Sequence, residues 1–131
     1  MGWQIGYDSR WQRDIGYGVP AICDRPRCGE KIDRGLEYVC GGEPYGGERG
    51  CGLYFCGDHL TGSRRLVRPF AAEPPRYVRV CGRCDKGRPP YEPTPDVREW
   101  LEWKLADESW GPWRDGNAEA VAAIRAALAA A

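Results

Sequence analysis

The nine residues that constrain this chain most strongly are Cys51-Gly52-Leu53-Tyr54-Phe55-Cys56-Gly57-Asp58-His59. They hold two thiols and the only histidine among the 131 residues of the sequence. Two residues separate Cys56 from His59, a spacing that lets one tight turn direct both side chains at a single metal ion. Thiolate and imidazole groups are the ligands that zinc prefers. The stretch therefore predicts a zinc site.

The other cysteines extend this pattern on both sides. The sequence has seven cysteines, and His59 brings the number of candidate ligands to eight, enough for two tetrahedral sites. In chain order they form four pairs, which are Cys23 and Cys28, Cys40 and Cys51, Cys56 and His59, and Cys81 and Cys84. We expect the wide, glycine-rich gap inside the second pair to form a hairpin-like loop. The spacing alone leaves open which pairs share an ion.

Cysteines can also serve other purposes, and an odd number leaves one thiol over in a closed disulfide framework. The first 20 residues contain no apolar segment of a signal peptide, so we expect a reducing, cytoplasmic compartment in which disulfides are rare. A free cysteine is often a small buried residue, and a Cys–His pair can act as nucleophile and base. Two closed sites would use all eight candidates and leave no position for water. We therefore expect two structural zinc ions and no enzymatic activity.

The stretch from Cys51 to His59 resembles the Cys-Gly-x-x-Phe-Cys-x-x-His signature of AN1-type zinc fingers. The four-pair layout, over residues 20–88, is similar to the cross-brace, treble-clef-like arrangement of RING, PHD and FYVE domains. The resemblance implies that the first and third pairs hold one zinc ion and the second and fourth pairs the other. The implied sites are Cys23, Cys28, Cys56 and His59, and Cys40, Cys51, Cys81 and Cys84.

A second resemblance concerns the whole chain. The segment Trp11–Pro20, ahead of the first ligand, is similar to small uncharacterised phage or prophage proteins. The chain has 16 arginines against 3 lysines and an alanine-rich tail, which fits a GC-rich bacterial or phage genome. This resemblance implies a phage or bacterial regulator.

The composition along the chain predicts four parts. We expect an aromatic N-terminal arm over 1–19, a binuclear zinc-finger domain over 20–88, a Pro-rich linker over 89–95 and a helical C-terminal segment over 96–131. The predicted fold is a small α+β zinc-binding domain with two cross-braced zinc sites and short β-hairpins, followed by C-terminal helices. We favour an arm that packs its aromatic side chains over the zinc core, and the alternative is an exposed binding arm.

Local patterns predict the elements that carry the ligands. Residues 36–39 and 53–55 are rich in β-forming side chains and flank the glycine-rich loop, so we expect them to pair as a hairpin. A short helix is expected near Asp58, where an acidic residue suits a helix N-terminus. A strand is expected over 77–80, leading into the last ligand pair.

The C-terminal segment is expected to hold two helices. Thr94 is predicted to cap a helix that has Pro95 at its first position and runs toward Asp107, with a break at Gly111-Pro112. Asn117 is predicted to cap the alanine-rich last helix, whose apolar stripe is Val121, Ile124 and Leu128. We expect these helices to pack on each other or on the zinc module, and the alternative is self-association or partner binding.

The net charge of zero conceals an uneven distribution. Residues 60–90 carry eight basic and two acidic side chains, whereas residues 91–131 carry four basic and eight acidic ones. The candidates for contact with nucleic acid or a partner are Arg64, Arg65, Arg68, Arg76 and Arg79. These arginines could instead balance the charge of the thiolates or pair with the acidic C-terminal helices.

The leading functional hypothesis is a non-enzymatic zinc-finger module that mediates a protein–protein interaction with an unidentified partner. The alternative is a nucleic-acid-binding or transcriptional regulator that acts through the Arg-rich stretch 64–88. A third interpretation is a RING-like ligase scaffold, from which the chain departs because Asp24–Arg27 stands where RING domains have apolar contacts. We expect no small-molecule substrate. Since no run approaches 18 apolar residues, we also expect no membrane association.

Overall fold

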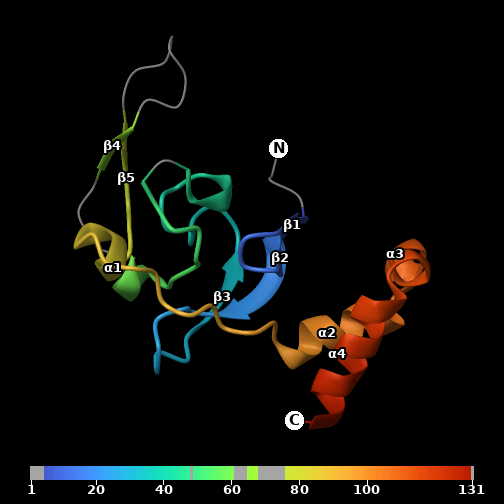
Figure 1. Ribbon diagram of the computed structural model, residues 1–131. Coiled ribbons are helices and arrows are strands. Elements are labelled where there is room, and N and C mark those ends of the chain that lie inside the picture. The colour runs from blue at the N-terminus through green and yellow to red at the C-terminus, as the bar shows by residue number, and fades with distance from the viewer. Residues whose placement is uncertain (1–4, 48, 61–64, 68–75, 131) are drawn as a thin grey trace. The chain divides into compact units, whose positions relative to one another are not determined.

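The computed structural model describes residues 5–47, 49–60, 65–67 and 76–130 (Figure 1). The chain divides into two compact units, Met1–Pro95 and Asp96–Ala131. The division falls at the end of the Pro-rich segment. Unit 1 holds strands and all eight candidate ligands, whereas unit 2 is helical. The described chain is therefore a small α+β protein with helices at its C-terminal end. No helix in the described ranges is long and apolar enough to cross a membrane.

Unit 1 begins with a three-stranded antiparallel sheet in the order β1-β2-β3. The strands are β1 (Gly6–Asp8), β2 (Arg13–Ile22) and β3 (Lys31–Arg34). The turn before β2 is held by Asp8, whose Oδ1 accepts hydrogen bonds from the backbone N–H groups of Arg10 and Trp11 at 3.0 and 3.3 Å. The pairing of β2 with β3 shifts register between Gly16 and Pro20. Gly16 and Gly18 therefore lie at an irregularity of the continuous strand β2.

Only some of the large side chains of the N-terminal segment pack in the interior, whereas the sequence predicts an arm whose aromatic side chains cover the zinc core. Ile15 is fully buried, and Trp11 packs against the cysteine-rich core and donates from Nε1 to the Cys51 carbonyl at 2.8 Å. Tyr7 and Tyr17 are exposed, and Trp3 lies outside the described residues. The segment is thus built into the sheet, and β2 runs past residue 20 to within one residue of Cys23.

The predicted pairing around the glycine-rich loop is present in a reduced form. A single antiparallel bridge joins Val39 to Tyr54, flanked by bonds from Cys40 N to Leu53 O at 2.8 Å and from Phe55 N to Tyr38 O at 2.9 Å. Two full strands do not form here. The loop then turns through a 3-10 helix, η1 (Pro44–Gly46), and returns beside Cys40. The pairing places Cys40 and Cys51 close together.

The remaining elements of unit 1 are short. The helix predicted near Asp58 is a 3-10 turn, η2 (Gly57–His59). The strand predicted over 77–80 is β5 (Arg76–Val78), which ends earlier and pairs antiparallel with β4 (Arg65–Val67). A single helical turn, α1 (Gly82–Asp85), carries the last ligand. Each candidate ligand pair therefore lies on or beside a tight turn.

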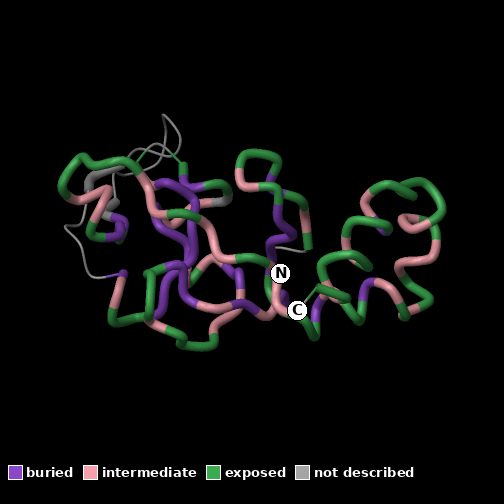
Figure 2. Tube along the Cα trace, turned by 60° about the horizontal axis from the view of Figure 1, so that its bottom comes forward, coloured by how far each residue is buried: buried purple, intermediate pink, exposed green. Residues whose placement is uncertain are grey.

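Several candidate ligands belong to the core of unit 1. Figure 2 shows where the buried parts of the chain lie. Nine buried residues form the main cluster, and five of them are cysteines; the members are Cys23, Cys40, Cys51, Leu53, Phe55, Cys56, Leu60, Val80 and Cys81. A second cluster of Ile15, Val39 and Tyr54 lies against Ile32, Leu36 and Tyr38. Five of the twelve buried residues in these two clusters are candidate ligands, so a bound metal ion would add to the folding free energy of unit 1.

Unit 2 consists of α2 (Arg98–Ala106), η3 (Glu108–Trp110), α3 (Gly111–Gly116) and α4 (Ala118–Ala130). The prediction that Thr94 caps a helix at Pro95 is wrong, because α2 begins at Arg98 and the Thr94 side chain bonds elsewhere in unit 1. The predicted run of this helix toward Asp107 is confirmed, whereas the predicted break at Gly111-Pro112 is wrong. Helix α2 already stops at Ala106, and the Gly–Pro pair begins α3, where the fixed backbone angle of proline suits a first turn.

The helices of unit 2 pack on one another, as one of the two expected arrangements. Ring centroids of Trp100 and Trp103 lie 5.0 Å apart, and those of Trp110 and Trp113 lie 5.5 Å apart. The Lys104 ammonium is 4.1 Å from the Trp113 ring centroid, a cation–π contact made by a side chain that is only 5% exposed. In α4, Val121 is buried while Ile124 and Leu128 are half-buried, so the predicted stripe is the inward face.

Two glycines differ sharply in what an added methyl group would meet. A Cβ at Gly50 would lie 2.0 Å from the Cys40 carbonyl oxygen, whereas a Cβ at Gly82 would meet nothing within 4 Å. We expect Gly50→Ala to lower the unfolding free energy by about 1–3 kcal/mol, because the backbone around Cys40 must move. Gly82→Ala is the matched control and should change it by less than about 0.5 kcal/mol. Urea unfolding at saturating zinc measures both, and equal stability of the two variants would contradict the described loop.

Candidate metal centres

The first group of candidate ligands is Cys23, Cys28, Cys56 and His59, whose ligand atoms all lie within 4.8 Å of one another. The Cys56 Sγ to His59 Nδ1 distance is 3.4 Å, the Cys23 Sγ to His59 Nδ1 distance is 3.7 Å, and the Cys28 and Cys56 sulfurs are 3.8 Å apart. A tetrahedral zinc ion with ordinary bond lengths separates its sulfur and nitrogen ligands by about 3.5–3.8 Å. The group therefore fits one such ion.

The second group is Cys40, Cys51, Cys81 and Cys84, again with all ligand atoms within 4.8 Å of one another. The Cys51 and Cys81 sulfurs are 4.0 Å apart. All seven cysteines lie in the described part of the chain, and none forms a disulfide. The structure thus brings the eight candidates together in the two sets that the cross-brace resemblance implies. Each set could hold one metal ion.

The two groups are built by the same backbone arrangement. In the first group, the Cys56 N–H donates to the Cys23 sulfur at 3.3 Å. The N–H of Asp24, the residue after Cys23, donates to the Tyr54 carbonyl at 2.8 Å. In the second, the Cys81 N–H donates to the Cys40 sulfur at 3.1 Å, and Gly41 donates to the Arg79 carbonyl at 2.8 Å. An N–H group directed at a sulfur favours its thiolate form. Because this arrangement occurs in both groups, we infer that both present a cysteine sulfur as a thiolate ligand for a metal ion.

Local turns present the ligands within each pair. In the loop between Cys23 and Cys28, the Cys28 N–H donates to the Arg25 carbonyl at 3.1 Å. The His59 N–H donates to the Cys56 carbonyl at 3.0 Å, which closes the turn η2. Both Cys56 and Cys81 immediately precede a helical turn. These closures explain why two to four intervening residues suffice to direct two side chains at one point.

Burial and hydrogen bonds shift the pKa values of several of the thiols. Burial raises the pKa of Cys23 to about 12. In the second group, hydrogen bonds from Cys40 and Cys51 lower the pKa of Cys81, while the hydrogen bond with Cys40 raises the pKa of Cys51. These hydrogen bonds favour the thiolate form at Cys81 and the protonated form at Cys51. A metal ion needs deprotonated sulfur, so binding must release protons and is expected to weaken as the pH falls.

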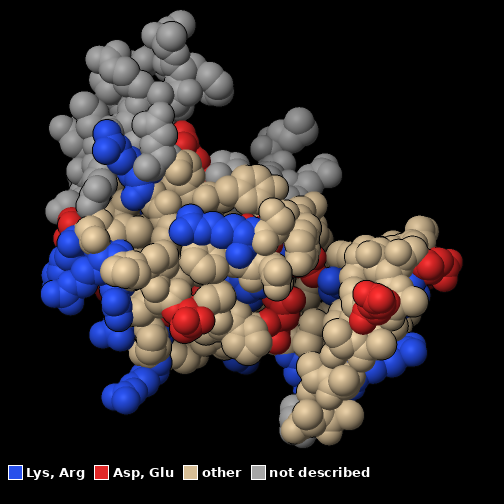
Figure 3. Space-filling model, viewed as in Figure 1, with Lys and Arg blue, Asp and Glu red and all other residues tan. Residues whose placement is uncertain are grey.

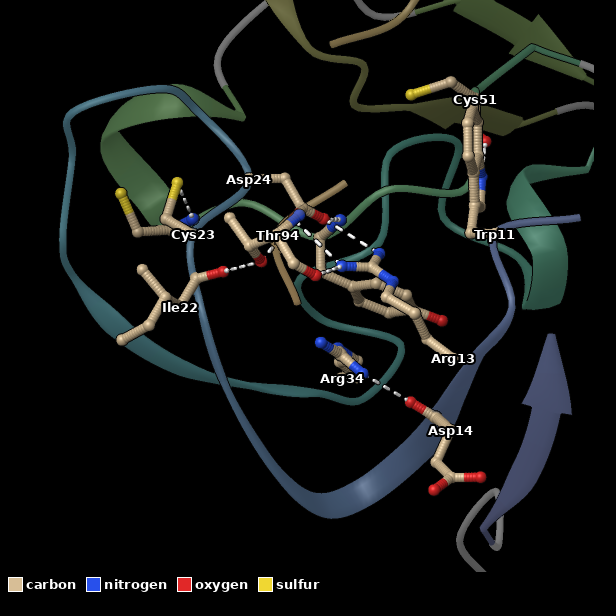
Figure 4. Close-up of polar contacts among 11 residues, drawn as sticks. Trp11, Arg13, Asp14, Ile22, Cys23, Asp24, Arg34, Cys51 and Thr94 are labelled. Atoms are coloured by element: carbon tan, nitrogen blue, oxygen red, sulfur yellow. Dashed lines mark hydrogen bonds and ion pairs between the residues drawn. The ribbon is translucent and has the colours of Figure 1, made fainter. Parts of the chain in front are cut away.

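A buried ion pair ties the first group to distant parts of unit 1 (Figure 4). Asp24 accepts two hydrogen bonds from the Arg13 guanidinium, at 2.9 and 3.0 Å, and both side chains are at most 4% exposed. The same carboxylate accepts from the Tyr54 N–H at 2.8 Å, and from the N–H and hydroxyl of Thr94 at 2.8 and 2.7 Å. One side chain beside Cys23 thus joins β2, the extended backbone before Cys56 and the Pro-rich segment.

Sequence reasoning missed this network. Asp24 and Thr94 are 70 residues apart and Arg13 is 11 residues from Asp24, so no local spacing connects them. The only available signal was an acidic residue placed directly after a candidate ligand. The Pro-rich segment, expected to be a stiff linker, is held against unit 1 through Thr94 and through Tyr91, whose ring lies 5.9 Å from that of Phe55.

The arginines predicted as a contact surface are largely beyond what the structure describes. Arg64 and Arg68 lie outside the described residues. Arg65 and Arg76 are at the ends of the pairing between β4 and β5. Arg79 is exposed, next to the second metal group. The structure therefore brings the metal candidates together, whereas it does not test these five arginines as one surface.

Comparisons with known proteins add no family to this description. No family model matches the chain, and neither a curated protein nor a solved structure does. The class defined by the geometry is accordingly a small α+β protein with two four-residue Cys/His groups that could each bind a metal ion.

Replacing the single histidine tests the first group. We expect His59→Ala to reduce the bound zinc from two ions to one and to destabilise unit 1, because three cysteines remain around an open position. His59→Cys is the matched control and should retain both ions, since four thiolates also form a closed zinc site. Elemental analysis of protein purified without chelator measures the metal content. Two ions in His59→Ala would exclude His59 as a ligand.

Removing one partner of the buried ion pair tests the network. Asp24→Ala should cost about 3–5 kcal/mol of unfolding free energy, because the Arg13 guanidinium stays buried without its carboxylate. Arg98→Ala, which breaks an exposed pair with Glu102 at 3.2 Å, should cost only about 0.3–0.5 kcal/mol. Urea unfolding of the zinc-loaded protein compares them. An Asp24→Ala loss no larger than that of Arg98→Ala would show that the network adds nothing.

Proposed function

We propose that this chain is a non-enzymatic zinc-finger module, in which two structural zinc ions hold a small scaffold that binds a partner protein. The observation that carries the proposal is the distribution of the eight candidate ligands into two groups of four. An ion with four protein ligands has no open position for a water molecule or a substrate, and catalytic zinc sites keep such a position. The geometry therefore favours a structural role over metal catalysis.

The donor set supports zinc as the metal. Seven thiolates and one imidazole are soft or intermediate ligands, which suit zinc better than calcium or magnesium. The apparent binding free energy of structural zinc in zinc-finger peptides is about 10–16 kcal/mol per site at neutral pH. This source of folding free energy matches a unit in which five of the nine residues of the main core cluster are cysteines.

Exposed apolar side chains support a protein partner. Ile5, just before the edge strand β1, is 44% exposed, and Tyr7 within β1 is 56% exposed. Tyr45 is 52% exposed in the glycine-rich loop. Aromatic side chains of this kind are enriched where proteins contact one another. The assignment to the cross-brace class and the role as a phage or bacterial regulator belong to this proposal. The RING-like ligase interpretation is weaker, because Arg25 and Arg27 are exposed cations in the first ligand loop.

The interaction role can be tested by capture from a native lysate on the immobilised, zinc-loaded chain, with and without nuclease. We expect a protein that is retained after nuclease treatment and lost with the double variant Tyr7→Ser, Tyr45→Ser. Glu37→Ser, which changes another exposed residue of unit 1, is the control and should retain it. Capture that depends entirely on nucleic acid, or that is unaffected by the tyrosine substitutions, would contradict the proposal.

A further inference from the structure

Two arginines from different ligand loops meet at one aromatic ring. Arg25 lies between Cys23 and Cys28, and its Cζ is 5.5 Å from the ring centroid of Tyr91. Arg83 lies between Cys81 and Cys84, and its Cζ is 4.9 Å from the same centroid. One loop belongs to each metal group. The fold thus gathers positive charge from two distant parts of the sequence at one place.

Three further cations extend this surface. Arg27 is exposed in the first loop, at a positive φ of 71°, and Lys86 and Arg88 are exposed just after α1. The N–H groups of Lys86 and Arg88 donate to the Arg83 carbonyl at 3.1 and 2.9 Å, so the chain curls back on itself there. We call these five residues the basic knuckle surface: Arg25, Arg27, Arg83, Lys86 and Arg88. Figure 3 shows Lys and Arg side chains gathered at the side of unit 1 where α1 lies.

No carboxylate of the described residues neutralises the cations of this surface, although Arg25 and Arg83 contact the Tyr91 ring. None of the five forms an ion pair with an Asp or Glu of the described ranges, whereas Arg13 and Arg98 do pair with carboxylates. Unpaired cations close together repel one another, and an anion that bridges them relieves that repulsion. Arg27, Lys86 and Arg88 extend into solvent, where screening limits their attraction to the buried thiolates. The surface is therefore available to an external anion.

The chemistry of the surface favours phosphate groups of a nucleic acid over an acidic protein. Four of the five cations are arginines, whose planar guanidinium groups match phosphate oxygens in a bidentate manner. Protein interfaces also use arginine, but they combine it with large aromatic or apolar anchors such as Trp and Tyr. Among the described residues the exposed ones are Ile5, Tyr7, Tyr17, Tyr45 and Trp103, and none belongs to the two ligand loops. Binding to a nucleic-acid backbone needs no such anchor.

We propose that the basic knuckle surface binds the phosphate backbone of nucleic acid without sequence preference. This inference rests on the proposed function in one respect, because the metal ions would hold the two ligand loops in place. The surface differs from the Arg-rich stretch predicted from the sequence, since it includes Arg25 and Arg27 from the first loop and only described residues. Five phosphate contacts would give a slope of log affinity against log salt of about −4.5 for duplex DNA.

The test uses the full, zinc-loaded chain and a fluorescently labelled DNA duplex of arbitrary sequence, with anisotropy measured from about 50 to 200 mM salt. We expect Arg27→Ser, Lys86→Ser to weaken binding and to reduce the slope by about two. Arg98→Ser, Arg125→Ser removes two exposed cations of unit 2 and is the matched control, with the same change in net charge. It should bind as the unaltered chain does.

Three results would overturn the inference. The first is an unaltered chain that does not bind the duplex at about 50 mM salt. The second is equal loss of affinity in both double variants, which would reflect net charge rather than a surface. The third is a lower zinc affinity of Arg27→Ser, Lys86→Ser with unchanged DNA binding, since the cations would then only balance the thiolates. Zinc content measured on the same samples separates these results from failure of the proposed function, which predicts two ions whether or not DNA binds.

Discussion

The convergence of eight thiol and imidazole groups on two points is the constraint on which unit 1 depends. Five of the nine residues in its main core cluster are cysteines, so the residues that would bind metal are also the residues that fill the interior. Burial raises the pKa of the Cys23 thiol, so a metal ion that binds there must displace a proton. With metal, the same atoms become the strongest connections between parts of the chain that have little regular structure to join them.

Around these two groups, hydrogen bonds connect the ligand loops with other segments of unit 1, as apolar packing does in proteins with a larger core. The Asp24 carboxylate, next to the first ligand, holds Arg13, the backbone before Cys56 and Thr94 of the Pro-rich segment in one buried network. The Trp11 indole donates to the carbonyl of Cys51 and so covers the second group. The N-terminal strands and the Pro-rich segment are therefore parts of the metal-binding unit. The helical unit has its own small core of tryptophans around Lys104.

The sequence was most informative where spacing has a direct geometric meaning. Pairs such as Cys56 and His59 can lie only on a tight turn, and the structure has such a turn at η2. It was least informative where a side chain serves a remote partner. Thr94 has the residue type and the following proline of a helix cap, yet Asp24, 70 residues away, takes its hydroxyl. Gly111-Pro112 is equally ambiguous, because a proline that ends one helix can begin the next. Burial of Arg13 and Asp24 likewise depends on tertiary packing that no local pattern encodes.

The central claim is that unit 1 is organised by two metal ions, each bound by one four-residue group. Native mass spectrometry of the full chain, purified without chelator, tests it most directly, because it counts the ions on the folded protein. The account predicts a single dominant species with two zinc ions per chain and all seven cysteines reduced. A folded chain without metal, or one whose cysteines are joined as disulfides, would contradict it.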